Sequence, residues 1–188
     1  MRGCARSFAG LLIAGSLAAC SVGPEPKLTA TAGPLSNWEV ILASDAIFGQ
    51  SRIATLRMNY NVNLATGDIR TGAFDLMCFK KSPLVRLRFN YKVGSNKSAN
   101  LAYRFDDNQG VEPKARFLRD FSTIVIDDPS EVRRFLVELT SASKLVMRVD
   151  SLIVGRTNIE MNVQGAPAAI EAALAACPLP PMTAENQT

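Results

Sequence analysis

Apolar and polar residues alternate in short stretches through most of the chain, and this pattern constrains the fold more than any other feature. In residues 84–91, Leu87, Phe89 and Tyr91 alternate with charged or amide side chains. A strand that is buried on one face and solvated on the other has this period of two. Turn-forming residues separate such stretches, which predicts an antiparallel sheet. The expected strands cover residues 37–42, 52–63, 74–79, 84–91, 100–105, 116–121, 122–126, 144–152 and 158–163.

Two helices are expected among these strands. Asp128, Pro129 and Glu131 form a typical helix start, with a capping aspartate, a proline at the first position and a glutamate that reaches back. Apolar side chains then recur at helical spacing, at Val132, Phe135, Leu136 and Leu139. A shorter Ala-rich helix follows Gly165. The sequence therefore predicts a mainly β (α+β) fold, an antiparallel β-sandwich-like domain with one packing helix and a short C-terminal helix.

The first 20 residues have the layout of an export signal. Arg2 and Arg6 precede an apolar stretch at residues 8–17, which is shorter than the ~20 residues that a membrane span needs. Residues 17–20 read LAAC, which resembles the bacterial lipobox. That resemblance implies cleavage after residue 19 and a diacylglyceryl group on Cys20, usually with a further acyl chain such as palmitate. The alternative is an ordinary cleaved signal followed by a chance cysteine.

Linker-type residues flank the predicted domain. We interpret residues 1–19 as a signal peptide, 20–36 as the lipidated cysteine with a flexible tether, 37–177 as one periplasmic domain and 178–188 as a disordered tail. Ser21 follows the cysteine, and under the enterobacterial sorting rule a serine there directs a lipoprotein outward. The expected location is the periplasmic face of the outer membrane, held by lipid, with the inner membrane as the alternative.

The composition argues against several classes of function. The chain has no histidine, which removes Ser-His-Asp and Cys-His nucleophiles and histidine zinc sites. Loss of Arg2 and Arg6 with the signal leaves 19 basic against 17 acidic residues, without the concentrated basic stripe that binds nucleic acid. We therefore expect no enzyme activity, no catalytic residue, no cofactor, no metal site and no nucleic-acid partner.

Two cysteines remain after Cys4 leaves with the signal and Cys20 takes up lipid. Cys78 lies in an expected strand and Cys177 ends the C-terminal helix. In an oxidising compartment a bridge between them would close a loop of about 100 residues and contribute up to ~4.7 kcal/mol by the loop-entropy argument. Two free buried thiols are the alternative.

The stretch around residue 103 is a candidate recognition surface. Alternation sends Tyr103 and Phe105 to one face of a strand and Arg104 and Asp106 to the other. Tyr103, Arg104 and Asp106 would then form an exposed recognition edge. The competing interpretation is a cross-strand ion pair with the aromatic side chains in the core.

The order of these landmarks resembles the periplasmic VasI-like proteins associated with type VI secretion. The shared pattern is an early tryptophan, a strand with a cysteine, a Tyr-Arg-x-Asp strand, a helix, a strand pair and a helix closed by cysteine. The matching residues are Trp38, 76–78, 103–106, 135–139, 145–149, 162–165 and 169–177. Residues 161–165 read MNVQG, where such proteins have F-x-L-x-G. The resemblance implies a sandwich-like domain with a Cys–Cys bridge and no catalytic residues.

We therefore expect a binding or assembly accessory of the cell envelope, anchored by lipid and bound to an envelope protein. If the resemblance extends to function, that partner belongs to a secretion apparatus. A domain that binds a small ligand or an envelope glycan is the alternative, and an enzyme that uses carboxylates alone is the third reading. An exposed apolar patch favours a protein partner, a concave pocket favours a ligand, and convergent carboxylates with shifted pKa values favour an enzyme.

Overall fold

The computed structural model describes residues 37–45, 49–61, 69–95 and 98–177. The signal peptide, Cys20, the tether and the C-terminal tail lie outside these described residues. In chain order the elements are β1 (Trp38–Asp45), β2 (Gly49–Asn61), β3 (Ile69–Phe79), β4 (Ser82–Phe89), β5 (Asn100–Phe105), β6 (Arg116–Phe117), β7 (Thr123–Ile126), α1 (Pro129–Ser141), β8 (Lys144–Ser151), β9 (Gly155–Asn162) and α2 (Ala166–Leu174).

The described strands belong to one antiparallel sheet. Eight of them follow the order β5-β8-β9-β2-β3-β4-β7-β6, and β1 pairs with β2 beside this path. β2 has 13 residues, and β3 lies along one of its edges. The other edge is shared, because β1 pairs with residues 49–56 of β2 and β9 meets it at Tyr60. The two parts of the sheet therefore meet on β2.

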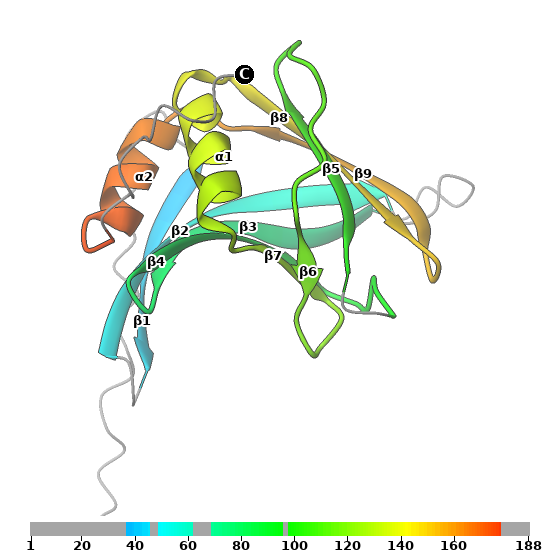
Figure 1. Ribbon diagram of the computed structural model, residues 1–188, viewed down its shortest axis with the longest axis horizontal. Helices are drawn as coiled ribbons and strands as arrows, with labels where there is room; N and C mark the ends of the chain where they lie inside the picture. Colours follow the sequence, from blue (N-terminus) through cyan, green and yellow to red (C-terminus); the bar gives the residue numbers. More distant parts are fainter. Residues whose placement is uncertain (1–36, 46–48, 62–68, 96–97, 178–188) are drawn as a thin grey trace, which may run out of the picture.

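The sheet curls until its two ends approach each other (Figure 1). Outside the strands, Ser98 bridges to Arg116 and Tyr103 bridges to Val111, which connects β5 with the segment that leads into β6. The mainly β, antiparallel class with two helices is confirmed. In place of the expected sandwich the described residues form one curled sheet, because backbone pairing runs from strand to strand and leaves no second sheet among them to stack on the first.

Helix α1 packs on the concave side of the curl (Figure 1). The ring centroid of Phe135, on α1, lies 5.8 Å from that of Phe74 on β3. It also lies 4.8 Å from Tyr103 and 5.0 Å from Phe105, both on β5. The ring of Trp38, at the start of β1, lies 5.6 Å from that of Phe74. Because β3 and β5 are distant in the strand order, one helical side chain joins both halves of the sheet into a single core.

The start and the buried face of α1 agree with the sequence pattern. The Asp128 carboxylate accepts hydrogen bonds from the backbone N–H groups of Ser130 and Glu131, at 3.0 and 3.2 Å, so the predicted cap is confirmed. Glu131, predicted to reach back to the cap, pairs with Arg134 instead. The four apolar residues of the predicted face are all buried: Val132, Phe135, Leu136 and Leu139.

Helix α2 lies over β1, β2 and β3 and is covalently attached to the sheet (Figure 1). Gly165 precedes it with a φ of 88°, a left-handed conformation that glycine adopts without steric penalty. Beyond the helix, Cys177 forms a disulfide with Cys78 of β3, with their Cα atoms 5.6 Å apart. The predicted bridge is confirmed, and the alternative of two free thiols is wrong.

The strand expected at residues 116–121 is shorter than the alternation suggests. β6 holds only Arg116 and Phe117, and the chain turns after it. The Asp120 carboxylate accepts hydrogen bonds from the backbone N–H of Ser122 at 3.1 Å, and from the N–H and hydroxyl of Thr123 at 3.0 and 2.7 Å. Local bonding of this kind competes with sheet pairing, and a period-two pattern does not reveal it.

Candidate partner-binding edge

β1 lies at an open edge of the sheet. It pairs with β2 from Trp38, opposite Leu56, to Asp45, opposite Gly49, and no other strand of the described chain pairs with it. Trp38 fixes the start of the strand, because its indole Nε1–H donates to the backbone oxygen of Val163 at 3.2 Å. The remaining edge of β1 presents backbone donors and acceptors to whatever lies beside it.

An apolar row crosses the convex face of the sheet and ends on β1. The strand register places Ile41, Ile53, Met77 and Leu84 side by side on four neighbouring strands. In the middle of the row, Ile53 and Met77 are only 5 and 8% exposed. Ile41, at the β1 end, is only partly buried. The row is therefore closed in its interior and open at the edge strand.

A polar row runs beside the apolar one. Its centre is the fully buried Asp75 on β3, whose carboxylate accepts hydrogen bonds from the Thr55 hydroxyl at 2.7 Å, Arg86 Nε at 2.8 Å and Arg88 Nε at 2.7 Å. The hydrogen bond to Asp75 raises the pKa of Arg88 above its usual value, although burial acts against this. Two guanidinium groups share one carboxylate, so the pairing satisfies a charge that burial would otherwise penalise.

The same polar row ends on β1 at Glu39. The register places Glu39 opposite Thr55, which in turn lies opposite Asp75. Glu39 is partly buried, and within the part of the chain that the structure describes it forms no ion pair. The open edge thus presents a partly buried isoleucine and, two residues before it, an unpaired carboxylate on the same face.

A polar slot adjoins the start of β1. It forms where β1 and β9 share one edge of β2, and its volume is about 370 Å³. Along this edge, no partner in the described chain pairs with the β2 backbone between Leu56 and Tyr60. The slot is rich in hydrogen-bonding side chains, among them Asn37, Glu39, Arg57, Asn59, Glu160 and Asn162.

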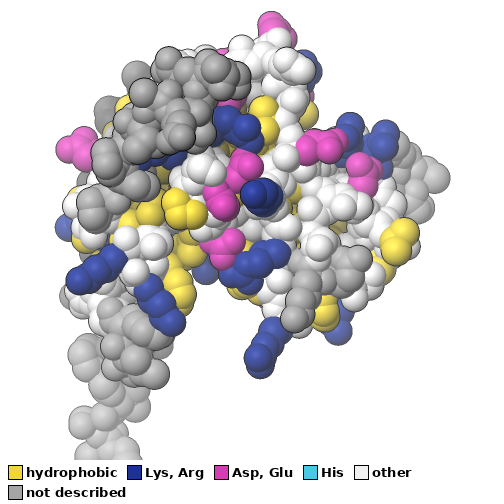
Figure 2. All heavy atoms as spheres, in the orientation of Figure 1, with side chains coloured by type: hydrophobic (Ala, Val, Ile, Leu, Met, Phe, Trp, Pro, Cys, Tyr) yellow, Lys and Arg dark blue, Asp and Glu magenta, His cyan; other side chains and the backbone are white. Residues whose placement is uncertain are grey.

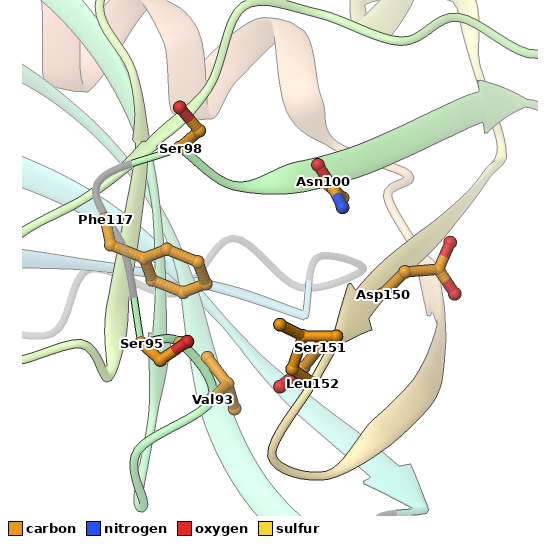
Figure 3. A pocket seen from close by; sticks show the side chains of 9 residues that line it. Val93, Ser95, Ser98, Asn100, Phe117, Asp150, Ser151 and Leu152 are labelled. Atoms are coloured by element: carbon orange, nitrogen blue, oxygen red, sulfur yellow. The ribbon is translucent and has the colours of Figure 1, made fainter.

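A second hollow, of about 230 Å³, lies between β5, β6 and the β8–β9 turn (Figure 3). The Phe117 ring and Leu152 face each other across it, whereas the Asp150 carboxylate points away. Asp150 pairs with Arg156 at 2.8 Å and with Arg148 at 3.2 Å. A Cβ atom on Gly94 would lie 2.5 Å from the Phe117 ring, so this glycine allows the ring to pack closely.

The structure separates the three residues of the predicted recognition edge. Tyr103 is buried against Phe135, and Arg104 is exposed. The Asp106 carboxylate accepts from the backbone N–H of Lys144 at 2.8 Å and of Ser143 at 3.2 Å. Tyr103 and Phe105 thus lie in the core, as the competing interpretation expects, but Asp106 bonds backbone amides instead of a guanidinium.

Two carboxyl groups whose pKa values are shifted belong to helix α1 and its cap, and they do not converge in one pocket. Hydrogen bonds from Ser130, then from the Glu131 amide, lower the pKa of Asp128 at the start of α1. Burial raises the pKa of Glu138, further along α1, and the charge of Arg134 partly offsets this. Within the described residues, no group of three or more Cys, Asp or Glu side chains could hold a metal ion.

Sequence reasoning did not single out β1 as a candidate site. The sequence pattern that could have pointed to it is the stretch VILAS at residues 40–44, which has no charge between Glu39 and Asp45. Edge strands usually carry a charge or a proline as protection against added strands. Such a sequence is equally typical of a central strand, so its meaning depends on the pairing.

No family model, curated protein or solved structure matches this chain. No helix of the described residues is long and apolar enough to cross a membrane.

Proposed function

We propose that the chain is an envelope lipoprotein that binds a protein partner by strand addition at β1. In this proposal Cys20 carries the lipid, the domain lies on the periplasmic face of the outer membrane, and the protein is an accessory of assembly. The resemblance to the type VI secretion-associated family makes a component of that apparatus the first partner to test.

The observation that carries the proposal is the apolar row that ends half-open at Ile41. A strand added to β1 would make main-chain hydrogen bonds along the free edge and would place its own side chain beside Ile41. That contact would extend the row Leu84–Met77–Ile53–Ile41 by one strand. The affinity would come from the backbone, and the selectivity from the side chains that face the row.

The neighbouring polar row indicates the chemistry of the partner strand. Glu39 and Ile41 lie two residues apart on the same face, so a matching strand would carry a basic residue and an apolar residue with one residue between them. The basic residue would supply to Glu39 the cation that Arg86 and Arg88 supply to Asp75.

Photocrosslinking in the native envelope tests the proposal. A photoreactive residue at the exposed Ser44 of β1 should form an adduct with a partner protein, whereas the same residue at Val137 on α1 should not. Adding Ile41→Lys or Glu39→Lys should abolish the Ser44 adduct, because each places a positive charge in the contact face. An adduct that survives both substitutions, or appears equally at Val137, would contradict strand addition at β1.

Lipid attachment has a separate test. A Cys20→Ser chain should leave the membrane fraction after export, because in this proposal the acyl chains on Cys20 are the anchor. Fractionation of the exported variant against the unaltered protein measures this, and continued sedimentation with membranes would overturn the anchor.

The polar slot favours a second candidate function. Its volume of about 370 Å³ falls within the ~300–1,000 Å³ of small-ligand sites, and its amide and carboxylate groups are suited to the hydroxyl groups of an envelope glycan. Titration with soluble glycan fragments should then shift the NMR signals of Asn59 and Asn162. Unchanged spectra at millimolar fragment would rule out this candidate and leave strand addition at Ser44 unaffected.

A further inference from the structure

Large hydrophobic side chains protrude at one end of the curled sheet. In the β8–β9 turn, Leu152 is 93% exposed and Ile153 is 54% exposed, and Ile69 at the start of β3 is 70% exposed. The β8–β9 turn lies on the right of the view, where hydrophobic side chains reach the surface (Figures 1 and 2). Ile69 lies at the same end, because it pairs with the last residue of β2, just beyond the residue that meets β9.

The turn that carries the two aliphatic residues is ordered. The Ser151 hydroxyl oxygen accepts hydrogen bonds from the backbone N–H of Ile153 at 3.0 Å and of Val154 at 3.3 Å. Gly155 closes the turn with a φ of 71°, in the region that favours glycine. Turns usually carry small polar residues. This one holds Leu152 and Ile153 outward in a fixed arrangement, so their exposure is a property of the fold.

Positive charges flank the apolar turn. Arg156 follows it and is exposed, and its charge is balanced by Asp150. Lys92 is also exposed, and its neighbour Val93 lines the same hollow as Leu152. Arg70 adjoins Ile69 and is exposed. Neither Lys92 nor Arg70 forms an ion pair within the described part of the chain.

The side chains of this end also interact electrostatically across strands. Burial raises the pKa of Tyr91, and the positive charge of Arg70 partly offsets that rise. Arg70 on β3 therefore lies near Tyr91, and the exposed Lys92 follows Tyr91 in the chain. Apolar side chains flanked by unpaired cations match the boundary between acyl chains and anionic headgroups.

We infer that the β8–β9 turn, with Ile69, Arg70 and Lys92, contacts the surface of an anionic lipid bilayer. Leu152 and Ile153 would enter the headgroup boundary, and Arg70 and Lys92 would lie at the level of the phosphates. Between Cys20 and Trp38 lie 17 residues, and an extended chain of that length spans about 60 Å, which leaves the domain room to turn towards the bilayer. The contact goes beyond the proposed function and uses a different surface from β1.

The experiment measures depth in the bilayer at two matched positions of the anchored protein. Ile153→Cys and Val137→Cys replace aliphatic residues that are both 54% exposed, the first on the turn and the second on α1. Cys78 and Cys177 are bridged, so an environment-sensitive fluorophore labels the new thiol. Each protein is reconstituted into phosphatidylcholine vesicles, with or without phosphatidylglycerol, and quenching by a nitroxide lipid is recorded.

The expected result is quenching at residue 153 that increases with phosphatidylglycerol, and a probe at residue 137 that stays solvated in both vesicles. Lys92→Gln should reduce the inserted population about fivefold, the effect of one basic residue near an anionic surface. Equal exposure of the two probes in both vesicles would overturn the inference. Protection of residue 153 only after addition of an envelope protein extract would overturn it as well, because the turn would then bind protein.

The two proposals fail independently. Loss of the Ser44 crosslink leaves the quenching at residue 153 unchanged if only strand addition is wrong. Solvent exposure of residue 153 in every vesicle, with the Ser44 crosslink intact, would refute only the lipid contact.

Discussion

Asp75 links three neighbouring side chains through one carboxylate. Thr55 comes from β2, and Arg86 and Arg88 come from β4. The carboxylate is fully buried, while the side chains of Arg86 and Arg88 are 22 and 44% exposed. Removing the acid therefore differs from removing one of the bases, because the bases can turn towards water and the acid cannot.

Substitutions in this cluster should be asymmetric. Asp75→Ala should lower the free energy of unfolding by about 3 kcal/mol, because it leaves two guanidinium groups without their acceptor. Arg88→Met should lower it by less than about 1 kcal/mol, since Arg86 still satisfies the carboxylate. Urea unfolding of the two variants measures the difference, and equal losses would contradict this account.

Asp128 gives a prediction about pH. Its pKa in the folded protein is lowered by hydrogen bonds from Ser130 and the Glu131 amide, so the stabilisation is present above the unfolded pKa of ~3.9 and is lost as the pH falls through the folded value. Asp128→Ala should lower the free energy of unfolding by about 1 kcal/mol at pH 7.

The measurement is urea unfolding of the unaltered and Asp128→Ala proteins between pH 7 and pH 2. The difference in stability should shrink towards the acid end. A difference that stays constant over this range would exclude the carboxylate as the source of the cap.

At the scale of elements, the disulfide determines how α2 is held. The bridge joins residues 99 positions apart, so it excludes many conformations of the unfolded chain. Cys177→Ala with Cys78→Ala should lower the free energy of unfolding by up to about 4 kcal/mol. Hydrogen exchange should show the largest loss of protection in α2, and unchanged protection there would mean that packing alone holds the helix.

The sequence predicted elements well where the determinants are local. The cap at Asp128 and the spacing from Val132 to Leu139 define α1 within a few residues, and alternation defines β4. β6 was overestimated, because the Asp120 side chain turns the backbone. The candidate edge was missed, since Val40 to Ala43 read as a strand without indicating how many partners it has.

At the scale of the whole molecule, Phe135 joins the two halves of the sheet. Phe135→Ala should lower the free energy of unfolding by about 4 kcal/mol. Protection from hydrogen exchange should fall in both β3 and β5, because the ring contacts Phe74 on one and Tyr103 and Phe105 on the other. A loss confined to α1 would show that the halves are stable without this contact.

The curl itself could not be predicted from alternation. A sandwich and a curled sheet have the same period of two along each strand, and they differ in which strands pair. Here the outcome depends on β9 meeting β2 at Tyr60, about 100 residues earlier in the chain, and on bridges such as Ser98 with Arg116. No local pattern in the sequence encodes these contacts.

The position of Trp38 also determines how the fold responds to a mechanical load. A pull on the chain that precedes residue 37 enters the domain at the first residue of β1. At this point the Trp38 indole donates a hydrogen bond to the backbone oxygen of Val163, and its ring packs against Phe74. After Trp38, the hydrogen bonds between β1 and β2 would break one after another along the strand. Such a force must therefore break the contacts of Trp38 first, and β1 would separate from β2 only after they are lost.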